Sequence, residues 1–195
     1  MNLPNRITLA RIIMIPLMIF FYLASFVPYG KIIAFVIFVV SSLTDFFDGY
    51  LARKYNLITN LGKFLDPIAD KLLTTSALVL VVCDLTVPAP YGVIALIVIL
   101  AREFIVSAFR QIAATKNYVM AADWWGKIKT NLQIYSCGGL MILSFLYSDT
   151  AYNGIGITVF EIINWVLLGL AVVSTIFSGV NYLVKNKKVL KDNEK

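Results

Sequence analysis

Histidine is absent from the 195-residue chain, and cysteine occurs only twice. Without imidazole the chain lacks the commonest general base and metal ligand, so carboxylates must perform any acid–base or metal chemistry. Cys83 and Cys137 share no motif, which argues against a disulfide framework or a zinc site and predicts two small core residues. The catalytic groups of this chain are therefore expected to carry oxygen atoms.

Charged residues are also scarce, at 14% of the chain against 59% hydrophobic residues, and the mean hydropathy is +0.82. This composition lies far outside the range of soluble proteins and predicts an all-α, polytopic membrane protein with six transmembrane helices. We expect a single six-helix transmembrane domain over residues 1–185 and a charged cytoplasmic tail over residues 186–195. The expected spans, each close to the ~20 residues that cross a bilayer, lie at about 8–27, 31–53, 63–83, 88–110, 126–147 and 160–184.

Basic residues are distributed unevenly along these spans. With a cytoplasmic amino terminus, the lysines and arginines lie on or lean toward the cytoplasmic side, and only Lys31 faces out. The positive-inside rule therefore places both termini in the cytoplasm. The same bias accounts for the net charge of +6, so no nucleic-acid partner is expected, although the basic rim would attract anionic lipid headgroups.

Four aspartates interrupt this apolar sequence in the order D-x-x-D-G-x-x-A-R-x8-G-x-x-x-D-x-x-x-D, from Asp45 through Asp48 and Asp66 to Asp70. Each pair has a spacing that puts both carboxylates on one face of a helix. The short link after Lys54 makes the second and third spans antiparallel neighbours, so all four can meet near the cytoplasmic surface. Ionised carboxylates at membrane depth are costly, and divalent cations would compensate for them.

Other residues of this segment have two readings each. Gly49 and Gly62 would let a bulky ligand approach the backbone, although close helix packing explains either glycine equally well. Arg53 either snorkels to the interface or binds phosphate oxygens. Pro67 is expected in the first turn of the third span, where its missing amide hydrogen is tolerated.

The segment from Asp45 to Asp70 resembles the complete signature of the CDP-alcohol phosphotransferase family, and the six-span layout is similar over nearly the whole chain. The resemblance implies a homodimer in which two divalent cations bind the diphosphate of a CDP-linked donor. It makes Asp45, Asp48 and Asp66 metal ligands, and it makes Asp70 both a ligand and the general base for an acceptor hydroxyl. Hard carboxylate oxygens suit Mg²⁺ or Mn²⁺.

The resemblance also implies a binding site for the donor, CDP-diacylglycerol. At the amino terminus, Asn5 and Thr8 match a donor-contacting segment, and helix capping is their alternative role. The other implied donor residues are Gly49, Ala52, Arg53, Thr59 and Gly62.

Basic residues in the fourth and fifth spans predict a phosphorylated acceptor. Cations there would hold a phosphate while the distal hydroxyl reaches the general base. We assign this role to Arg110, Lys127 and Lys129. The alternative is positive-inside anchoring, with Arg102 in contact with Glu103 or with lipid.

Residues 101–130 and the opening residues 2–5 are similar to the bacterial branch of the family that makes phosphatidylglycerophosphate. This implies transfer of a phosphatidyl group to sn-glycerol 3-phosphate, with release of CMP, in the bacterial cytoplasmic membrane. A sibling enzyme that uses phosphatidylglycerol or inositol phosphate is the alternative within the family. Outside it, a membrane scaffold would tolerate loss of Asp70, and a cation transporter would favour midplane acids and broken helices in paired repeats, which the sequence does not show.

Overall fold

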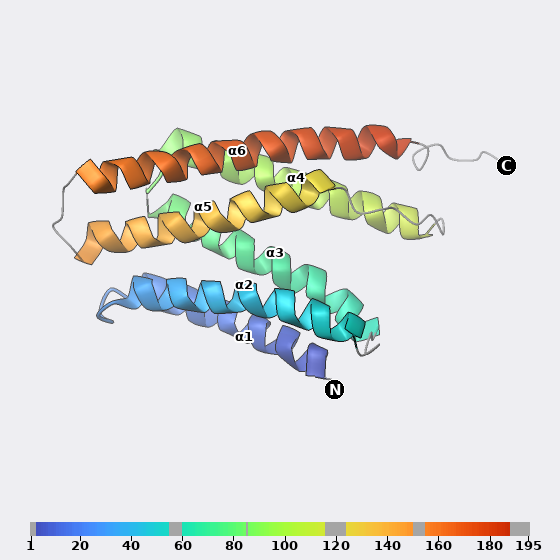
Figure 1. The fold of residues 1–195 in the computed structure, drawn as a ribbon, viewed down its shortest axis with the longest axis horizontal. Helices are drawn as coiled ribbons and strands as arrows, with labels where there is room; N and C mark the ends of the chain where they lie inside the picture. Colours follow the sequence, from blue (N-terminus) through green and yellow to red (C-terminus); the bar gives the residue numbers. More distant parts are fainter. Residues whose placement is uncertain (1–2, 55–59, 85, 116–123, 150–154, 188–195) are drawn as a thin grey trace.

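The computed structural model describes residues 3–54, 60–84, 86–115, 124–149 and 155–187, and its regular elements there are all α-helices. Successive helices run in alternating directions along one long bundle, and the start of α1 and the end of α6 lie toward the same end (Figure 1). The all-α prediction with six helices is confirmed for this part of the chain. The helices are α1 (Leu3–Leu23), α2 (Gly30–Lys54), α3 (Asn60–Cys83), α4 (Ala89–Thr115), α5 (Trp124–Asp149) and α6 (Ile155–Lys185).

Helix length and hydropathy agree with a membrane setting. The shortest helix, α1, has 21 residues, and such a helix is about 30 Å long, the thickness of a bilayer core. Within the described chain, three helices are both long and apolar enough to cross a membrane, in the segments Asn5–Leu23, Ala89–Ala113 and Ile155–Lys185. The other three are similar in length but carry more polar residues.

The core of the bundle is apolar and draws on all six helices. Helix α1 packs on α2 and α3, α5 packs on α2, α3 and α6, and α4 packs mainly on α6. Met18, Phe38, Leu78 and Leu140 are almost completely buried in the main cluster. Large apolar side chains on α1, α4 and α6 are exposed instead, as expected for surfaces that face lipid.

Helices α5 and α6 approach each other closely at Gly139. A Cβ atom on this glycine would overlap with Oδ1 of the buried Asn164. The Asn164 side chain donates a hydrogen bond to the Phe160 carbonyl at 2.8 Å, and Ser136 Oγ donates to the Asn164 carbonyl at 3.3 Å. Small residues, and hydrogen bonds between helices such as that from Ser136 of α5 to Asn164 of α6, join helices inside membranes.

At the distal end of the bundle, where α1 ends and α2 begins, one carboxylate joins four helices. Asp84, just after α3, accepts hydrogen bonds through Oδ2 from Lys31 Nζ at 2.8 Å, from the Tyr22 hydroxyl at 3.3 Å and from Ser144 Oγ. We call these four residues the Asp84 cluster. A cavity of about 460 Å³ beside it is lined partly by Tyr22, Lys31, Cys83 and Asp84.

Two expectations about single residues are wrong. Helix α3 begins at Asn60, so Pro67 lies inside the helix and not in its first turn. Helix α3 starts before its apolar stretch because the polar residues that precede the stretch adopt the same helical backbone. Proline lacks an amide hydrogen, so the carbonyl one turn earlier loses a helical partner there. Both cysteines were expected in the core, but only Cys137 is buried, and Cys83 is exposed at the end of α3.

Candidate active site beside Asp70

The four aspartates of the motif occupy the facing ends of two successive helices. Asp45 and Asp48 lie in the last three turns of α2, and Asp66 and Asp70 follow the start of α3. Helices α2 and α3 contact each other. Asp70 is the one aspartate of the four whose side chain the structure describes, and the other three are placed by their helical backbone alone.

The metal site therefore stays a prediction. The described side chains do not include those of Asp45, Asp48 and Asp66, and among the described ones no three acidic or cysteine groups lie close enough to hold a metal ion. What supports the prediction is the helical backbone, which gives both pairs the spacing of neighbours on one helix face.

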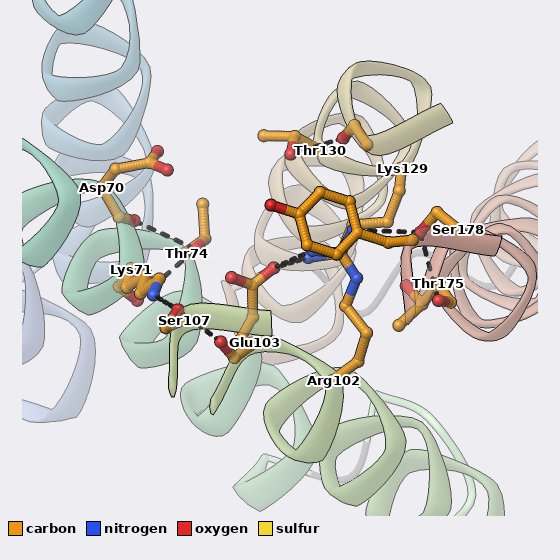
Figure 2. A network of polar contacts seen from close by, with 12 residues as sticks. Asp70, Lys71, Thr74, Arg102, Glu103, Ser107, Lys129, Thr130, Thr175 and Ser178 are labelled. Atoms are coloured by element: carbon orange, nitrogen blue, oxygen red, sulfur yellow. Dashed lines mark hydrogen bonds and ion pairs between the residues drawn. The ribbon is translucent and has the colours of Figure 1, made fainter. Parts of the chain in front are cut away.

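Asp70 lies in the third turn of α3 and is half-buried. The hydroxyl of Thr74 donates to its backbone carbonyl at 3.1 Å. The side chains of Asp70 and Lys71 leave the helix in different directions, and Lys71 points toward Ser107 of α4 (Figure 2). The carboxylate of Asp70 is thus directed away from this lysine.

A polar network crosses from α3 through α4 to α5 next to Asp70 (Figure 2). Lys71 donates to Ser107 Oγ, which donates to the Glu103 carbonyl at 2.6 Å. The Glu103 carboxylate accepts from Lys129 Nζ and lies 3.6 Å from Nη1 of Arg102. We call these five residues the Glu103 network. It contains three cations and one carboxylate.

Lys129 is the most deeply buried member of this network, with 2% of its surface exposed. A buried ammonium group without a partner is strongly unfavourable, and the ion pair with Glu103 supplies one. The nearby guanidinium of Arg102 is held on its other side by Ser178 Oγ of α6, which accepts from Nη2 at 3.2 Å. The alternative reading of Arg102, a contact with Glu103, is confirmed.

The three basic residues assigned to an acceptor phosphate do not share one environment. Lys127 is exposed and Lys129 is buried. Their environments differ because residues two apart on a helix face different sides. Arg110 is exposed on α4, and its Nε donates to the Tyr182 hydroxyl of α6 at 3.2 Å. Of the three, the structure thus places only Lys129 in the Glu103 network.

The amino-terminal candidates Asn5 and Thr8 lie within α1, and they are 5% and 1% exposed. Because α1 begins at Leu3, neither occupies the capping position before the helix, so the capping alternative is wrong for the described helix. Arg11, at 1% exposure, continues the same helix face at the same spacing. Sequence reasoning missed Arg11, although this spacing of three polar residues was visible.

The remaining donor candidates are placed only in part. Gly49, Ala52 and Arg53 belong to the last turns of α2, and Gly62 belongs to the first turn of α3. Thr59 lies outside the described residues. Sequence reasoning named Glu103 only as a contact of Arg102, and it missed the links of Glu103 to Lys129 and of Lys71 to Ser107, because these partners lie on other helices.

Comparison with known proteins gives consistent results. Residues 1–180 match the family model described as CDP-alcohol phosphatidyltransferase. A CDP-diacylglycerol–glycerol-3-phosphate 3-phosphatidyltransferase of Bacillus subtilis (strain 168) is 40% identical, over 97% of this chain and 97% of the relative. Proteins with the same name from Rickettsia bellii (strain RML369-C), 38% identical over 96% of each chain, and Haemophilus influenzae (strain ATCC 51907 / DSM 11121 / KW20 / Rd), 37% identical over 98% and 97%, are also similar.

Proposed function

The chain belongs to the CDP-alcohol phosphatidyltransferase family, and from this premise we propose that it transfers a phosphatidyl group from CDP-diacylglycerol to sn-glycerol 3-phosphate. The products are phosphatidylglycerophosphate and CMP. The observation that carries the proposal is the likeness, over nearly the full length of both chains, to relatives whose names state this donor and this acceptor.

We propose that all six helices cross the bacterial cytoplasmic membrane, with both termini and the active site on the cytoplasmic side. The alternating helix directions support this topology, as does the placement of the start of α1 and the end of α6 at the same end of the bundle. The domain would extend over residues 1–185, with residues 186–195 as a cytoplasmic tail. Helices α2, α3 and α5 could cross the membrane despite their polar residues because Ser41, Thr74, Lys129 and Ser136 are buried in the bundle.

Asp45, Asp48, Asp66 and Asp70 would hold two divalent cations, Mg²⁺ or Mn²⁺. The chemistry of the donor set fits, since the chain has no histidine and carboxylate oxygens are the preferred ligands of these ions. When bound, the ions neutralise the diphosphate and stabilise charge on the leaving group.

Asp70 would act on the acceptor. Its carboxylate takes the proton of the acceptor hydroxyl as that oxygen forms a bond to the β-phosphorus, and the bond from this phosphorus to the bridging oxygen breaks so that CMP leaves. The donor would be held by Asn5, Thr8, Gly49, Ala52, Arg53, Thr59 and Gly62. Two chains would form a homodimer.

The acceptor phosphate would be held by Lys129, with Lys127 and Arg110 as further cations. Lys129 is the best supported of these because it is buried on α5, which packs on α3, the helix that carries Asp70. A small acceptor could then place its phosphate against Lys129 and its hydroxyl against Asp70.

The test is CMP release from CDP-diacylglycerol by the purified protein in detergent, with a panel of acceptors. We expect activity with sn-glycerol 3-phosphate and little with glycerol, phosphatidylglycerol or inositol phosphate. Preference for another acceptor would identify a sibling enzyme. Absence of CMP release with every acceptor, from a folded and metal-supplied sample, would overturn the enzymatic proposal and favour a transporter or a scaffold.

A further inference from the structure

The Glu103 network contains a carboxylate to which the proposed reaction assigns no role. We propose that Glu103 is a positioning residue of the acceptor site, which holds the ammonium group of Lys129 in place for the acceptor phosphate and ties it to the helix that carries Asp70. This inference rests on the proposed function, because it needs a phosphorylated acceptor.

The first step of the argument is burial. Only 3% of the Lys129 side chain is exposed, so water solvates little of its charge, and the Glu103 carboxylate is the partner that replaces most of this solvation. An ammonium group has three hydrogens to donate, and the bond to Glu103 uses one of them. The others can serve phosphate oxygens, provided that Glu103 keeps the group oriented.

The second step is charge. Lys71, Arg102 and Lys129 bring three cationic groups to the network, and Glu103 neutralises only one of them. The excess of positive charge, inside a bundle with an apolar core, favours binding of a small anion such as a phosphate monoester. Among the described side chains, the carboxylate of Asp70 reduces this excess without removing it.

The third step is the connection between helices. The Glu103 carbonyl accepts from Ser107 Oγ at 2.6 Å, and Ser107 in turn accepts from Lys71, the neighbour of Asp70 in α3. One residue thus binds Lys129 through its side chain and is linked to α3 through its backbone. This arrangement fixes where the phosphate is held relative to the general base, which is what a short acceptor with a phosphate and a hydroxyl requires.

The test is steady-state kinetics of the full chain in detergent, with sn-glycerol 3-phosphate varied at saturating CDP-diacylglycerol and Mg²⁺. For E103Q we expect the KM for the acceptor to rise about tenfold or more, as for loss of one charge-assisted contact. The kcat and the KM for the donor should change little. E103D keeps the carboxylate and should recover part of the acceptor KM. The matched control is E161Q, since Glu161 bonds the Tyr147 hydroxyl near the α5–α6 connection, away from Asp70.

A double-mutant cycle separates positioning from simple helix stabilisation. If Glu103 acts through Lys129, E103Q combined with K129M should have no higher acceptor KM than K129M alone. Additive effects, or an unchanged acceptor KM in E103Q, would overturn the inference while leaving the proposed function intact. If E103Q does not fold, E103D decides, because a fall in kcat without a rise in acceptor KM would also overturn it. A wild-type protein that ignores sn-glycerol 3-phosphate would instead refute the proposed function.

Discussion

The Asp84 cluster and the Glu103 network are two polar clusters of the same bundle, and each is built around one carboxylate. At the distal end, Asp84 pairs with a single ammonium, that of Lys31, and its other donors are the neutral hydroxyls of Tyr22 and Ser144. Beside Asp70, Glu103 is outnumbered by cations. The distal cluster is balanced in charge, and the network is not.

This difference distinguishes a structural contact from a binding site. A balanced cluster needs nothing more, so its hydrogen bonds serve to join helices. The Glu103 network has more cations than carboxylates, although only Lys129 among the cations is buried. This excess favours an anion near it, and at this place the proposed anions are the Asp70 carboxylate and the acceptor phosphate. Lysine and carboxylate side chains therefore join helices in the Asp84 cluster and bind a ligand in the proposed site, because the ratio of cations to carboxylates differs between the two clusters.

The largest effect should come from removal of divalent cations. With EDTA in excess over all divalent ions, CMP release should fall below ~1% of its initial rate, because the carboxylate site then lacks the ions that neutralise the diphosphate. Addition of Mg²⁺ or Mn²⁺ in excess over the chelator should restore it. Transfer that continues unchanged in chelator would contradict the metal site.

Loss of the general base should be the next largest effect. In D70N, CMP release should fall by about 10²–10⁴-fold, the usual contribution of general base catalysis. The thermal unfolding temperature should stay close to that of the wild type, since Asp70 is only half-buried. Retention of full activity would show that another group takes the proton.

Gly139 belongs to neither cluster and tests helix packing alone. G139A should lower the free energy of unfolding by about 1–3 kcal/mol, the usual cost of overpacking, because the new methyl group would meet Asn164. Thermal unfolding in detergent measures this loss. The double variant G139A/N164A should regain stability if the clash is the cause, and no recovery would point to another source of strain.

A substitution in the Asp84 cluster should lower the stability of the protein without changing the reaction. In D84N, Lys31 loses its charged partner, and we expect a loss of about 1–2 kcal/mol, since both side chains are partly exposed. The exposed Cys83 beside it provides a local measurement, because its alkylation by a maleimide should become faster. The kcat and acceptor KM of the folded fraction should not change. A raised acceptor KM would mean that the two clusters are coupled.

The smallest effect should come from the exposed member of the predicted acceptor set. K127A should raise the acceptor KM only about two- to threefold, since an exposed charge pair contributes little. K129M should raise it much more, because Lys129 is buried. Equal effects of the two substitutions would show that burial in the Glu103 network does not determine which lysine binds phosphate.

Much of the fold was predictable from local properties. Each of the six expected spans corresponds to a helix, and most of the differences lie at the helix ends. For example, α1 begins at Leu3 and α4 continues to Thr115. Apolar runs mark where a helix is buried in lipid or protein, but polar turns at its ends follow the same backbone hydrogen bonding and carry no hydropathy signal. For the same reason Pro67 was expected in the first turn of its helix, whereas α3 begins seven residues earlier, at Asn60.

The candidate site was predictable only in part. The spacing of Asp45, Asp48, Asp66 and Asp70 is a property of single helices, so it could be read without coordinates. The pairing of Lys129 with Glu103 joins residues 26 positions apart, and that of Lys71 with Ser107 joins residues 36 apart. Neither pairing has a local pattern.

The sequence by itself thus determined the membrane-like composition, the helices and the aspartate motif, because hydropathy and helical periodicity depend on neighbours along the chain. Only the tertiary structure decided that Lys129 is buried and paired with Glu103, that Lys127 is exposed, and that Glu103 is linked to Lys71 through Ser107. The physical reason is that helix packing chooses which face of each helix meets another. A buried charge is stable only where that choice supplies its partner.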